Sequence, residues 1–176
     1  MKENRKLKIC FMGGNQAGLI GALTILSKEH QILSAVSFSD DVSSLFERLG
    51  TPVYESVEDE GFTRDLKDAD VLFSVHGREI VSDDLLKFPR FGGVNVHPYL
   101  YKYKGADPVG TALKNGDFKA SVGAHVMESA VDEGEVLVED FTDVSGSSSV
   151  TDIYNRLYPY YCSVILKVLE MYDGKK

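Results

Sequence analysis

The sequence has few cysteines, no tryptophan and no long apolar run. Its two cysteines, Cys10 and Cys162, each lie in a short apolar stretch. Such thiols are typically buried, and they stay reduced in the cytosol. A membrane-spanning helix needs about 18 apolar residues in a row, and the apolar part of the N-terminus is too short for a signal peptide. We therefore expect a cytoplasmic protein without a membrane partner.

Basic side chains are also scarce. The chain has 19 Lys and Arg residues against 27 Asp and Glu residues, which gives a formal net charge of −8. A broad contact with nucleic acid phosphates needs a basic patch, so we expect no nucleic-acid partner. No pair of His or Cys residues has the spacing of metal ligands, so we also expect no metal site.

The length and composition fit one globular domain. The chain has 176 residues, of which 43% are hydrophobic and 26% are charged. A chain of this length is long enough to bury most of its apolar surface in one core. No internal repeat and no shift in composition divides it. Residues 1–176 are therefore predicted to form a single domain.

Short apolar runs alternate with segments of helical spacing along most of the chain. This alternation predicts a doubly wound α/β fold with a mostly parallel sheet. Two later runs fit strands that are antiparallel and added at the end of the sheet. The predicted strands cover residues 7–12, 32–38, 71–75, 93–96, 121–127 and 135–140, and the predicted helices cover 17–28, 42–49, 58–68, 82–87, 108–115 and 151–172.

The ends of the predicted strands carry polar side chains. Ligands of doubly wound sheets bind outside the carboxyl ends of the strands, so we expect Gly13-Gly14, His76-Gly77 and the 95–97 segment to line one crevice. Asn95 and His97 are two residues apart and share one face of their strand. A loop is expected to begin at His97.

Asn95, His97 and Asp132 form the candidate chemical site. An imidazole near pH 7 can take or give a proton, and a neighbouring carboxylate would fix its tautomer and stabilise its charged form. An Asn amide can donate to a developing oxyanion. Together these groups suit attack on a carbonyl carbon by a substrate amine. The alternative is an ordinary strand-end histidine beside two turn residues.

The segments NVHPYLYKYKGADPVGTALKNGD and VGAHVMESAVDEGEVL contain four spaced motifs. These are an N-x-H-P loop, a Lys-Gly turn, an N-G-D turn and a V-D-x-G loop. Their order and spacing closely resemble the catalytic core of the folate-dependent formyltransferase family. The resemblance covers residues 73–137, and more loosely residues 7–169. It implies the Rossmann-like fold of that family.

The resemblance also implies a reaction. Members of the family transfer the formyl group of 10-formyltetrahydrofolate to a primary amine, so the implied partners are a reduced folate and a small amine. The family's catalytic Asn, His and Asp match Asn95, His97 and Asp132. Asn95 and protonated His97 would stabilise the oxyanion. Asp132 would orient His97 and assist removal of the proton from the attacking amine.

Two loops match those that hold the pterin ring in the family, largely through main-chain groups. The first has Arg78-Glu79 where the family usually has apolar or aromatic residues, so a charged surface turn is the alternative. The residues expected to bind the cofactor are Arg78, Glu79, Ile80, Val81, Ser129, Ala130 and Val131.

Three further groups are candidates for substrate binding. The turn after the first strand could bind an anion through its N–H groups, or it could be a tight turn only. His125 matches a histidine of the family members that formylate glycinamide ribonucleotide, which we call the ribonucleotide branch. The alternative is that it is a buried core residue. The tyrosine-rich loop after His97 is one residue shorter than in the family, and its side chains either stack on a ligand or cover the crevice. The residues expected to bind substrate are Gly13, Gly14, Asn15, Tyr99, Tyr101, Lys104 and His125.

The resemblance leaves open which amine is formylated. Three branches of the family act on methionyl-tRNA, on glycinamide ribonucleotide and on amino sugars. The methionyl-tRNA branch normally has a basic C-terminal domain that this sequence does not show, and a net charge of −8 opposes tRNA binding. The ribonucleotide branch carries an acid-His pair in its last helix that has no clear equivalent here. We therefore expect a nucleotide-linked amino sugar or a related non-tRNA amine.

The alternatives are glycinamide ribonucleotide, in purine synthesis, and a ligand-binding module that has lost catalysis. A further expectation concerns assembly. A strand near residues 136–138 would leave an unpaired edge through which two subunits could form a homodimer.

Overall fold

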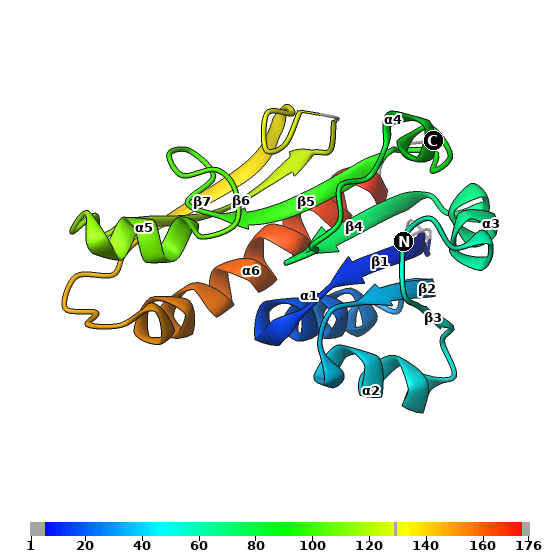
Figure 1. Cartoon of the computed structure of the whole chain (residues 1–176), viewed down its shortest axis with the longest axis horizontal. Helices are drawn as coiled ribbons and strands as arrows, with labels where there is room; N and C mark the ends of the chain where they lie inside the picture. The colour runs from blue at the N-terminus through cyan, green and yellow to red at the C-terminus, as the bar shows by residue number, and fades with distance from the viewer. Residues whose placement is uncertain (1–5, 129, 174–176) are drawn as a thin grey trace, which may run out of the picture.

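One seven-stranded sheet runs through the molecule, and the computed structural model describes residues 6–128 and 130–173 (Figure 1). The strands are β1 (Lys8–Gly13), β2 (Gln31–Ser37), β3 (Val53–Tyr54), β4 (Val71–Val75), β5 (Gly93–Pro98), β6 (Lys119–Val126) and β7 (Val136–Asp143). The helices are α1 (Asn15–Ser27), α2 (Asp40–Leu49), α3 (Glu60–Asp68), α4 (Asp83–Leu86), α5 (Pro108–Lys114) and α6 (Val150–Asp173).

The strand order is β3-β2-β1-β4-β5-β6-β7. Neighbouring strands from β3 to β5 are parallel, whereas β6 is antiparallel to β5 and β7 is antiparallel to β6. This confirms the predicted α/β fold, in which a mostly parallel sheet ends in late antiparallel strands.

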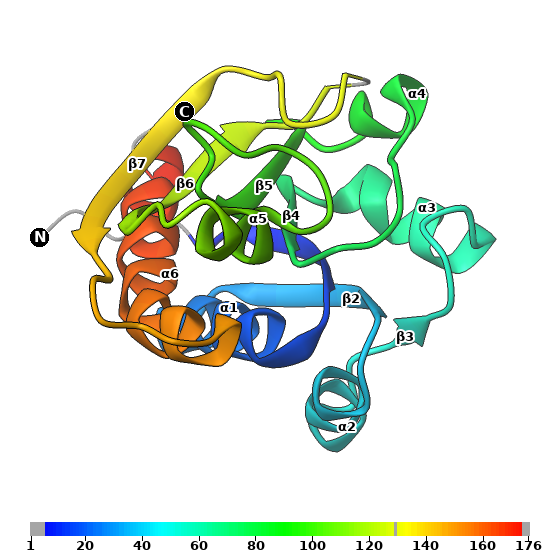
Figure 2. The ribbon, with the colours of Figure 1, turned by 60° about the vertical axis from the view of Figure 1, so that its left-hand side comes forward.

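Helices cover both faces of the sheet because its central strands are apolar on both sides. On β1, Ile9 and Phe11 face a core that also contains residues of α1, α2, α5 and α6. Cys10 and Met12 point the other way, into a core shared with α3 and α4. Figure 2 shows α1 and α6 side by side, on the face of the sheet toward which Ile9 and Phe11 point.

Strand β5 extends further than the sequence predicted. Its last partner on β4 is Val75, which pairs with Val96, while His97 and Pro98 pair with β6. His97 is therefore a strand residue and not the start of a loop. Pro98 has no N–H to donate, and it is tolerated because the β4 side of the strand is free there. Because β5 continues past the end of β4, it has no neighbouring strand on that side among the described residues, and the cavity lies beside this unpaired end.

Two other bounds differ from the prediction. Helix α1 begins at Asn15, which has a positive φ of 56°, and not at residue 17. The helix expected over 82–87 is a single turn, α4, whose N-terminus is capped by the Ser82 hydroxyl. Asp83 and Asp84 in that first turn favour helix formation, but Pro89 limits its length.

The sheet ends on β7, an edge strand with half-exposed apolar side chains such as Val136 and Phe141. Asp140 fixes this edge on α6, because its carboxylate accepts hydrogen bonds from Ser163 Oγ and Lys167 Nζ. Pairing of two subunits along this edge stays a prediction. No helix within the described ranges is both long and apolar enough to cross a membrane.

Helix α2 offers a matched test of the core. Phe46 is fully buried and its ring lies 5.6 Å from that of Phe11, whereas Leu49 on the same helix is 54% exposed. We expect Phe46→Ala to lower the free energy of unfolding by about 3–5 kcal/mol, through lost burial and a cavity. Leu49→Ala should change it by less than about 0.5 kcal/mol. Urea unfolding measures both, and equal losses would contradict this packing.

Candidate functional site

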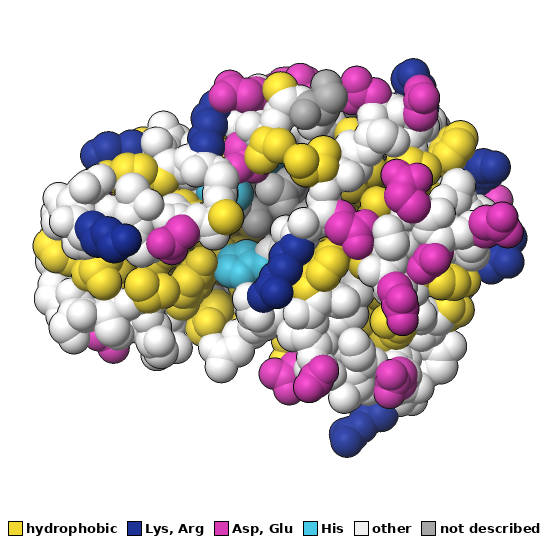
Figure 3. All heavy atoms as spheres, viewed as in Figure 1, with side chains coloured by type: hydrophobic (Ala, Val, Ile, Leu, Met, Phe, Trp, Pro, Cys, Tyr) yellow, Lys and Arg dark blue, Asp and Glu magenta, His cyan; other side chains and the backbone are white. Residues whose placement is uncertain are grey.

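A cavity of about 700 Å³ lies at the carboxyl ends of β1, β4 and β5. Figure 3 shows this hollow in the middle of the molecular face, with histidine side chains inside it. Its walls come from the loops that follow β1, β4, β5 and β6, and from the first turns of α6. His76-Gly77 and the 95–97 segment line this crevice as predicted, whereas Gly13 and Gly14 do not.

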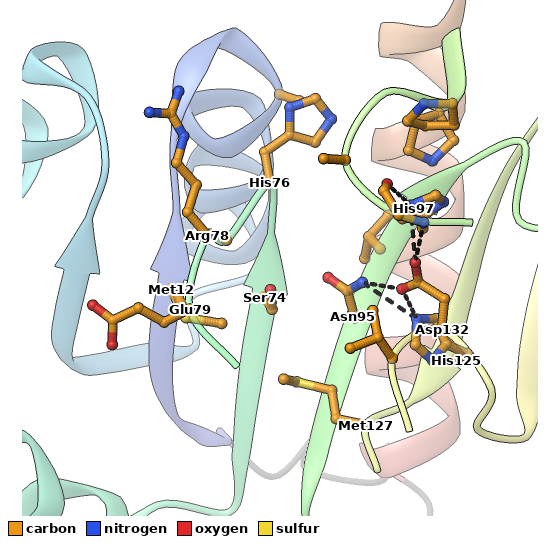
Figure 4. Close-up of a pocket in the computed structure, with 18 of the residues that line it drawn as sticks. Met12, Ser74, His76, Arg78, Glu79, Asn95, His97, His125, Met127 and Asp132 are labelled. Atoms are coloured by element: carbon orange, nitrogen blue, oxygen red, sulfur yellow. Dashed lines mark hydrogen bonds and ion pairs between the residues drawn. The ribbon is translucent and has the colours of Figure 1, made fainter. Parts of the chain in front are cut away.

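The carboxylate of Asp132 lies at the centre of a buried polar cluster (Figure 4). Its Oδ2 accepts a hydrogen bond of 2.9 Å from the Gly105 N–H and lies 3.3 Å from His97 Nε2. Its Oδ1 lies 3.3 Å from both His125 Nε2 and Asn95 Nδ2. The structure thus brings the three predicted catalytic residues together, with His125 as a fourth member.

Local structure explains how these side chains meet. Asn95 and His97 point the same way from β5, and the β5–β6 register places His125 directly opposite Asn95. Asp132 lies in a turn with a positive φ of 55°. A side chain at Gly134 would put its Cβ 1.9 Å from the Val126 carbonyl oxygen, so only glycine lets this turn pack on β6.

Asp132 is a carboxylate at neutral pH. Burial by itself raises its pKa, but hydrogen bonds from a protonated His125 and from the Gly105 N–H, and the charge of a protonated His97, outweigh burial and lower it to about 2. A buried anion of this kind stabilises any positive charge that develops on the adjoining imidazoles.

Hydrogen-bond partners assign the two histidine tautomers. Nε2 of His97 faces two oxygen acceptors, the Gly105 carbonyl at 3.1 Å and the Asp132 carboxylate, so this nitrogen carries the proton. His125 Nδ1 lies 2.8 Å from the Val126 carbonyl oxygen and therefore donates to it. Nδ1 of His97 is buried without a partner among the described residues, so the ring must turn slightly before this atom reaches a ligand.

Asn95 is oriented differently from the sequence-based expectation. Its Nδ2 faces Asp132 and lies 3.2 Å from His125 Nε2, while Figure 4 shows its Oδ1 directed away from them, toward the cavity. Nδ2 is thus already used within the cluster. In this orientation Asn95 offers a ligand an acceptor, and not the oxyanion donor predicted from sequence.

The first predicted cofactor loop lines the cavity, as do Val131 and Asp132 of the second loop. Figure 4 shows the Arg78 and Glu79 side chains pointing in different directions. The Glu79 carboxylate accepts hydrogen bonds from Ser56 Oγ and the Val57 N–H, so it anchors the loop and is not free for a ligand.

The other loop residues differ in their position. Ile80 is 72% exposed at the cavity, whereas Val81 is almost fully buried. Ala130 is exposed, and it is not among the residues that line the cavity. Ser129 lies outside the described residues.

The predicted anion site after β1 is not supported. The Gly14 N–H donates to the Val75 carbonyl oxygen at 3.3 Å, and the Asn15 N–H donates to Ser39 Oγ at 2.9 Å. Gly13 is the last residue of β1, where an added Cβ would lie 2.7 Å from the Val75 oxygen. The tight-turn alternative fits these contacts, and only Asn15 of the three lines the cavity.

Tyr99, Tyr101 and Lys104 also lie outside the cavity lining, which corrects the expectation that they face a ligand. Tyr99 is fully buried and its hydroxyl donates to the Asp117 carbonyl oxygen. The Tyr101 hydroxyl donates to the Lys119 carbonyl oxygen, and Lys104 forms an ion pair with Glu133. These side chains hold the loops in place.

Histidine 125 is a supporting residue in this geometry. It lines the cavity but is only 2% exposed, and both of its ring nitrogens have partners. It orients Asp132 and leaves no nitrogen for a substrate. Within residues 6–128 and 130–173, no group of three or more His, Cys, Asp or Glu side chains is arranged to hold a metal ion.

Sequence reasoning missed most of one wall of the cavity. Gln16, Pro108, Tyr154 and Tyr158 line it together with His76, which was expected at the crevice but given no role. The two tyrosines are four residues apart, a spacing that puts them on one helix face and could have marked them as a pair. Nothing in the sequence indicated that this face would meet the end of β4.

Comparisons with known proteins show which family the chain resembles. A family model described as formyl transferase matches residues 25–169. Over 182 residues the chain is 24% identical to methionyl-tRNA formyltransferase of Fusobacterium nucleatum, covering 94% of this chain and 58% of that protein. Over 103 residues it is 31% identical to the bifunctional polymyxin resistance protein ArnA of Wigglesworthia glossinidia brevipalpis, covering 58% of this chain and 16% of that protein. The chain thus spans less than two thirds of the length of these relatives.

A solved structure shares the fold over its whole length. Glycinamide ribonucleotide transformylase 1 of Geobacillus kaustophilus superposes with a TM-score of 0.79, covering 97% of this chain and 100% of that one. Sequence identity is 18%, so the likeness shows the arrangement of sheet and helices and not a common substrate.

The lowered pKa of Asp132 predicts a pH-dependent contribution to stability. The pKa of Asp132 is about 2 in the folded protein, against 3.8 for an ordinary Asp side chain, which represents the unfolded chain. This difference means that the ionised carboxylate stabilises the fold at pH 7 by about 2 kcal/mol. This contribution is complete above pH 3.8 and is lost as the pH falls toward 2. Asp132→Asn should therefore destabilise the protein at pH 7, and by about 1 kcal/mol less at pH 3.

Urea unfolding of the wild type and of Asp132→Asn at both pH values measures this difference. Glu133→Gln, at the neighbouring exposed carboxylate, is the control and should show little pH dependence. A penalty for Asp132→Asn that stays constant from pH 7 to pH 3 would contradict the proposed ionisation.

Proposed function

Since the chain belongs to the formyl transferase family, we propose that it transfers the formyl group of 10-formyltetrahydrofolate to a primary amine of a small substrate. The proposed amine is a nucleotide-linked amino sugar or a related non-tRNA amine. The observation that carries this proposal is the buried Asp132 carboxylate held between His97 and His125 at the wall of the cavity.

The cavity fits a reduced folate. Its volume of about 700 Å³ suits a ligand of that size, and apolar side chains of Met12, Ile80, Met127 and Val131 line the region next to the 77–81 loop. Such a region accommodates a flat heteroaromatic ring, while main-chain groups of the loop are available to its polar edge. When bound, 10-formyltetrahydrofolate supplies the electrophilic formyl carbon.

In this proposal His97 and Asp132 stabilise the charge that develops during the reaction and transfer protons. His97 takes up a proton at Nδ1 and, after a small rotation of its ring, donates from that atom toward the formyl oxygen on which negative charge develops. Asp132 stabilises the resulting imidazolium through Nε2. The proton lost by the attacking amine passes to Asp132 directly or through water, and a proton from His97 or water would neutralise the donor nitrogen as its bond to the formyl carbon breaks.

Asn95 positions the attacking amine. Its Oδ1 faces the cavity and accepts a hydrogen bond from an amine N–H, which aims the nitrogen lone pair at the formyl carbon. Holding the two reacting groups together in this way supplies much of the rate enhancement of such transfers.

Similarity to several branches of the family leaves the amine as a proposal. The relatives include a methionyl-tRNA formyltransferase and the bifunctional polymyxin resistance protein ArnA. The match to ArnA is 31% identical over 103 residues, and another methionyl-tRNA formyltransferase is 32% identical over 130 residues, so identity favours neither branch. The net charge of −8, which opposes tRNA binding, supports an acceptor outside the tRNA branch.

Removal of the His97 imidazole tests the proposed chemistry. We expect His97→Ala to lower the rate of formyl transfer by about 100-fold to 10,000-fold, as for the loss of a general acid–base group. The measurement follows the absorbance of the folate product with an amino sugar nucleotide, glycinamide ribonucleotide and methionyl-tRNA as acceptors.

Tyr101→Phe is the control, since this residue lies outside the cavity and should leave the rate unchanged. Full turnover by His97→Ala would sink the proposed mechanism. Binding of a reduced folate without transfer to any amine would favour the alternative of a module that has lost catalysis.

A further inference from the structure

One end of the cavity is walled by aromatic side chains that the proposed chemistry does not use. We call His76, Tyr154 and Tyr158 the aromatic wall. His76 follows β4, and the two tyrosines come from the first turns of α6. The ring of Tyr154 lies edge-on to His76 with centroids 5.4 Å apart, and Tyr154 and Tyr158 are stacked at 6.2 Å.

His76 is held in a defined orientation. Its backbone has a positive φ of 56°, which is uncommon for a residue with a side chain, and its Nε2 lies 2.7 Å from the Tyr161 hydroxyl. Figure 4 shows its imidazole directed from the end of β4 toward the side of the cavity that carries His97. Tyr161 is fully buried and stacks edge-on against the same ring.

The Tyr161 contact fixes the His76 tautomer. Burial keeps the Tyr161 pKa well above 10, so its hydroxyl keeps its proton. Within the described residues, His76 Nε2 is the partner of this hydroxyl, so the O–H donates to it. Burial, and then the charges of His97 and Arg78, lower the His76 pKa to about 4. Neutral His76 therefore carries its proton on Nδ1, which leaves one N–H available to a ligand.

The rest of the wall is uncharged as well. Burial raises the Tyr154 pKa to about 12, and the Tyr158 hydroxyl donates to Gln16 Oε1 at 2.7 Å. A phosphate would find no cation at this wall. Arg78 on the 77–81 loop lines the same cavity, and its exposed guanidinium has no ion pair or hydrogen bond within residues 6–128 and 130–173.

We infer that the aromatic wall holds an uncharged, saturated ring that bears the acceptor amine. The C–H groups of such a ring pack on the tyrosine faces, and His76 Nδ1–H donates to a ring hydroxyl or ring oxygen. A phosphate attached to the ring lies toward Arg78. This inference rests on the proposed function and narrows its substrate to an amine on a sugar-like ring, as opposed to an amine on an open chain.

Kinetics of paired variants test the wall. With an amino sugar nucleotide as acceptor, Tyr154→Leu should raise KM about tenfold, because the aromatic face is lost. Tyr154→Phe keeps that face and should restore the wild-type KM. In all variants kcat should change less than KM, and the Kd of 5-formyltetrahydrofolate should stay unchanged.

Two substitutions of His76 test its hydrogen bond to the substrate. His76→Ala should raise KM about fivefold through loss of one hydrogen bond. His76→Asn should recover most of this loss, since Asn tolerates a positive φ and its amide N–H replaces the Nδ1–H donor. An unchanged KM in Tyr154→Leu and His76→Ala, or a weakened folate in place of a weakened amine, would overturn the inference.

A binding measurement tests the wall without turnover. The chain has no tryptophan, so Tyr158→Trp places a single fluorophore at the wall and Tyr101→Trp places one outside the cavity. In the presence of 5-formyltetrahydrofolate, the methyl glycoside of a 4-amino-4-deoxyhexose should change the emission of Tyr158→Trp and not that of Tyr101→Trp. Glycinamide ribonucleotide, whose amine is on an open chain, should bind more weakly.

The two proposals can fail separately. Failure of the wild type to bind 5-formyltetrahydrofolate and to formylate any amine would reject the proposed function. The fluorescence titration still decides on the wall in that case, because saturable binding of the glycoside supports it and no response at millimolar concentrations rejects it. Efficient transfer that prefers glycinamide ribonucleotide would keep the proposed function and reject the inference.

Discussion

The buried carboxylate of Asp132 is the group on which the site depends. An isolated charge in a protein interior costs far more free energy than a surface charge, so it persists only where it is fully hydrogen-bonded. Here the Gly105 N–H, the His97 Nε2–H and the Asn95 amide donate to it, and the His125 ring lies beside it. These groups come from β5, β6 and the loop between β5 and α5. A single ionised group therefore ties three parts of the chain together.

The topology of the sheet supplies this arrangement. Because β6 runs antiparallel to β5, His125 lies beside Asn95, and the turn after β6 returns Asp132 to the same place. Because β4 ends before β5 does, the cavity opens between their ends. Its lining differs in character from region to region, with apolar side chains such as Met12 and Ile80 in one part and the aromatic wall in another. This division suits the proposed transfer of a group between two different molecules.

Residues within regular strands were predictable, and residues within loops were less so. The fold class followed from alternating strands and helices, and the meeting of Asn95 and His97 followed from the two-residue period of a strand. The tyrosine-rich loop could not be predicted, because a positive φ of 53° at Tyr99 turns that side chain into the core. Spacing likewise gave no sign that His76 would be directed at α6. Which way the Asn95 amide faces depends on its neighbours, and these are known only once the chain is folded.

The central claim is that Asp132 lies between two histidines in opposite tautomers, with the His125 proton held on Nδ1 by the Val126 carbonyl oxygen. Two-dimensional ¹H–¹⁵N correlation spectra of the protein with ¹⁵N-labelled histidine test it most directly, with His97→Gln and His125→Gln to assign the signals. We predict that near neutral pH His97 carries its proton on Nε2 and His125 carries its proton on Nδ1. A His97 ring protonated on Nδ1 alone, or two rings with the same tautomer, would contradict the account.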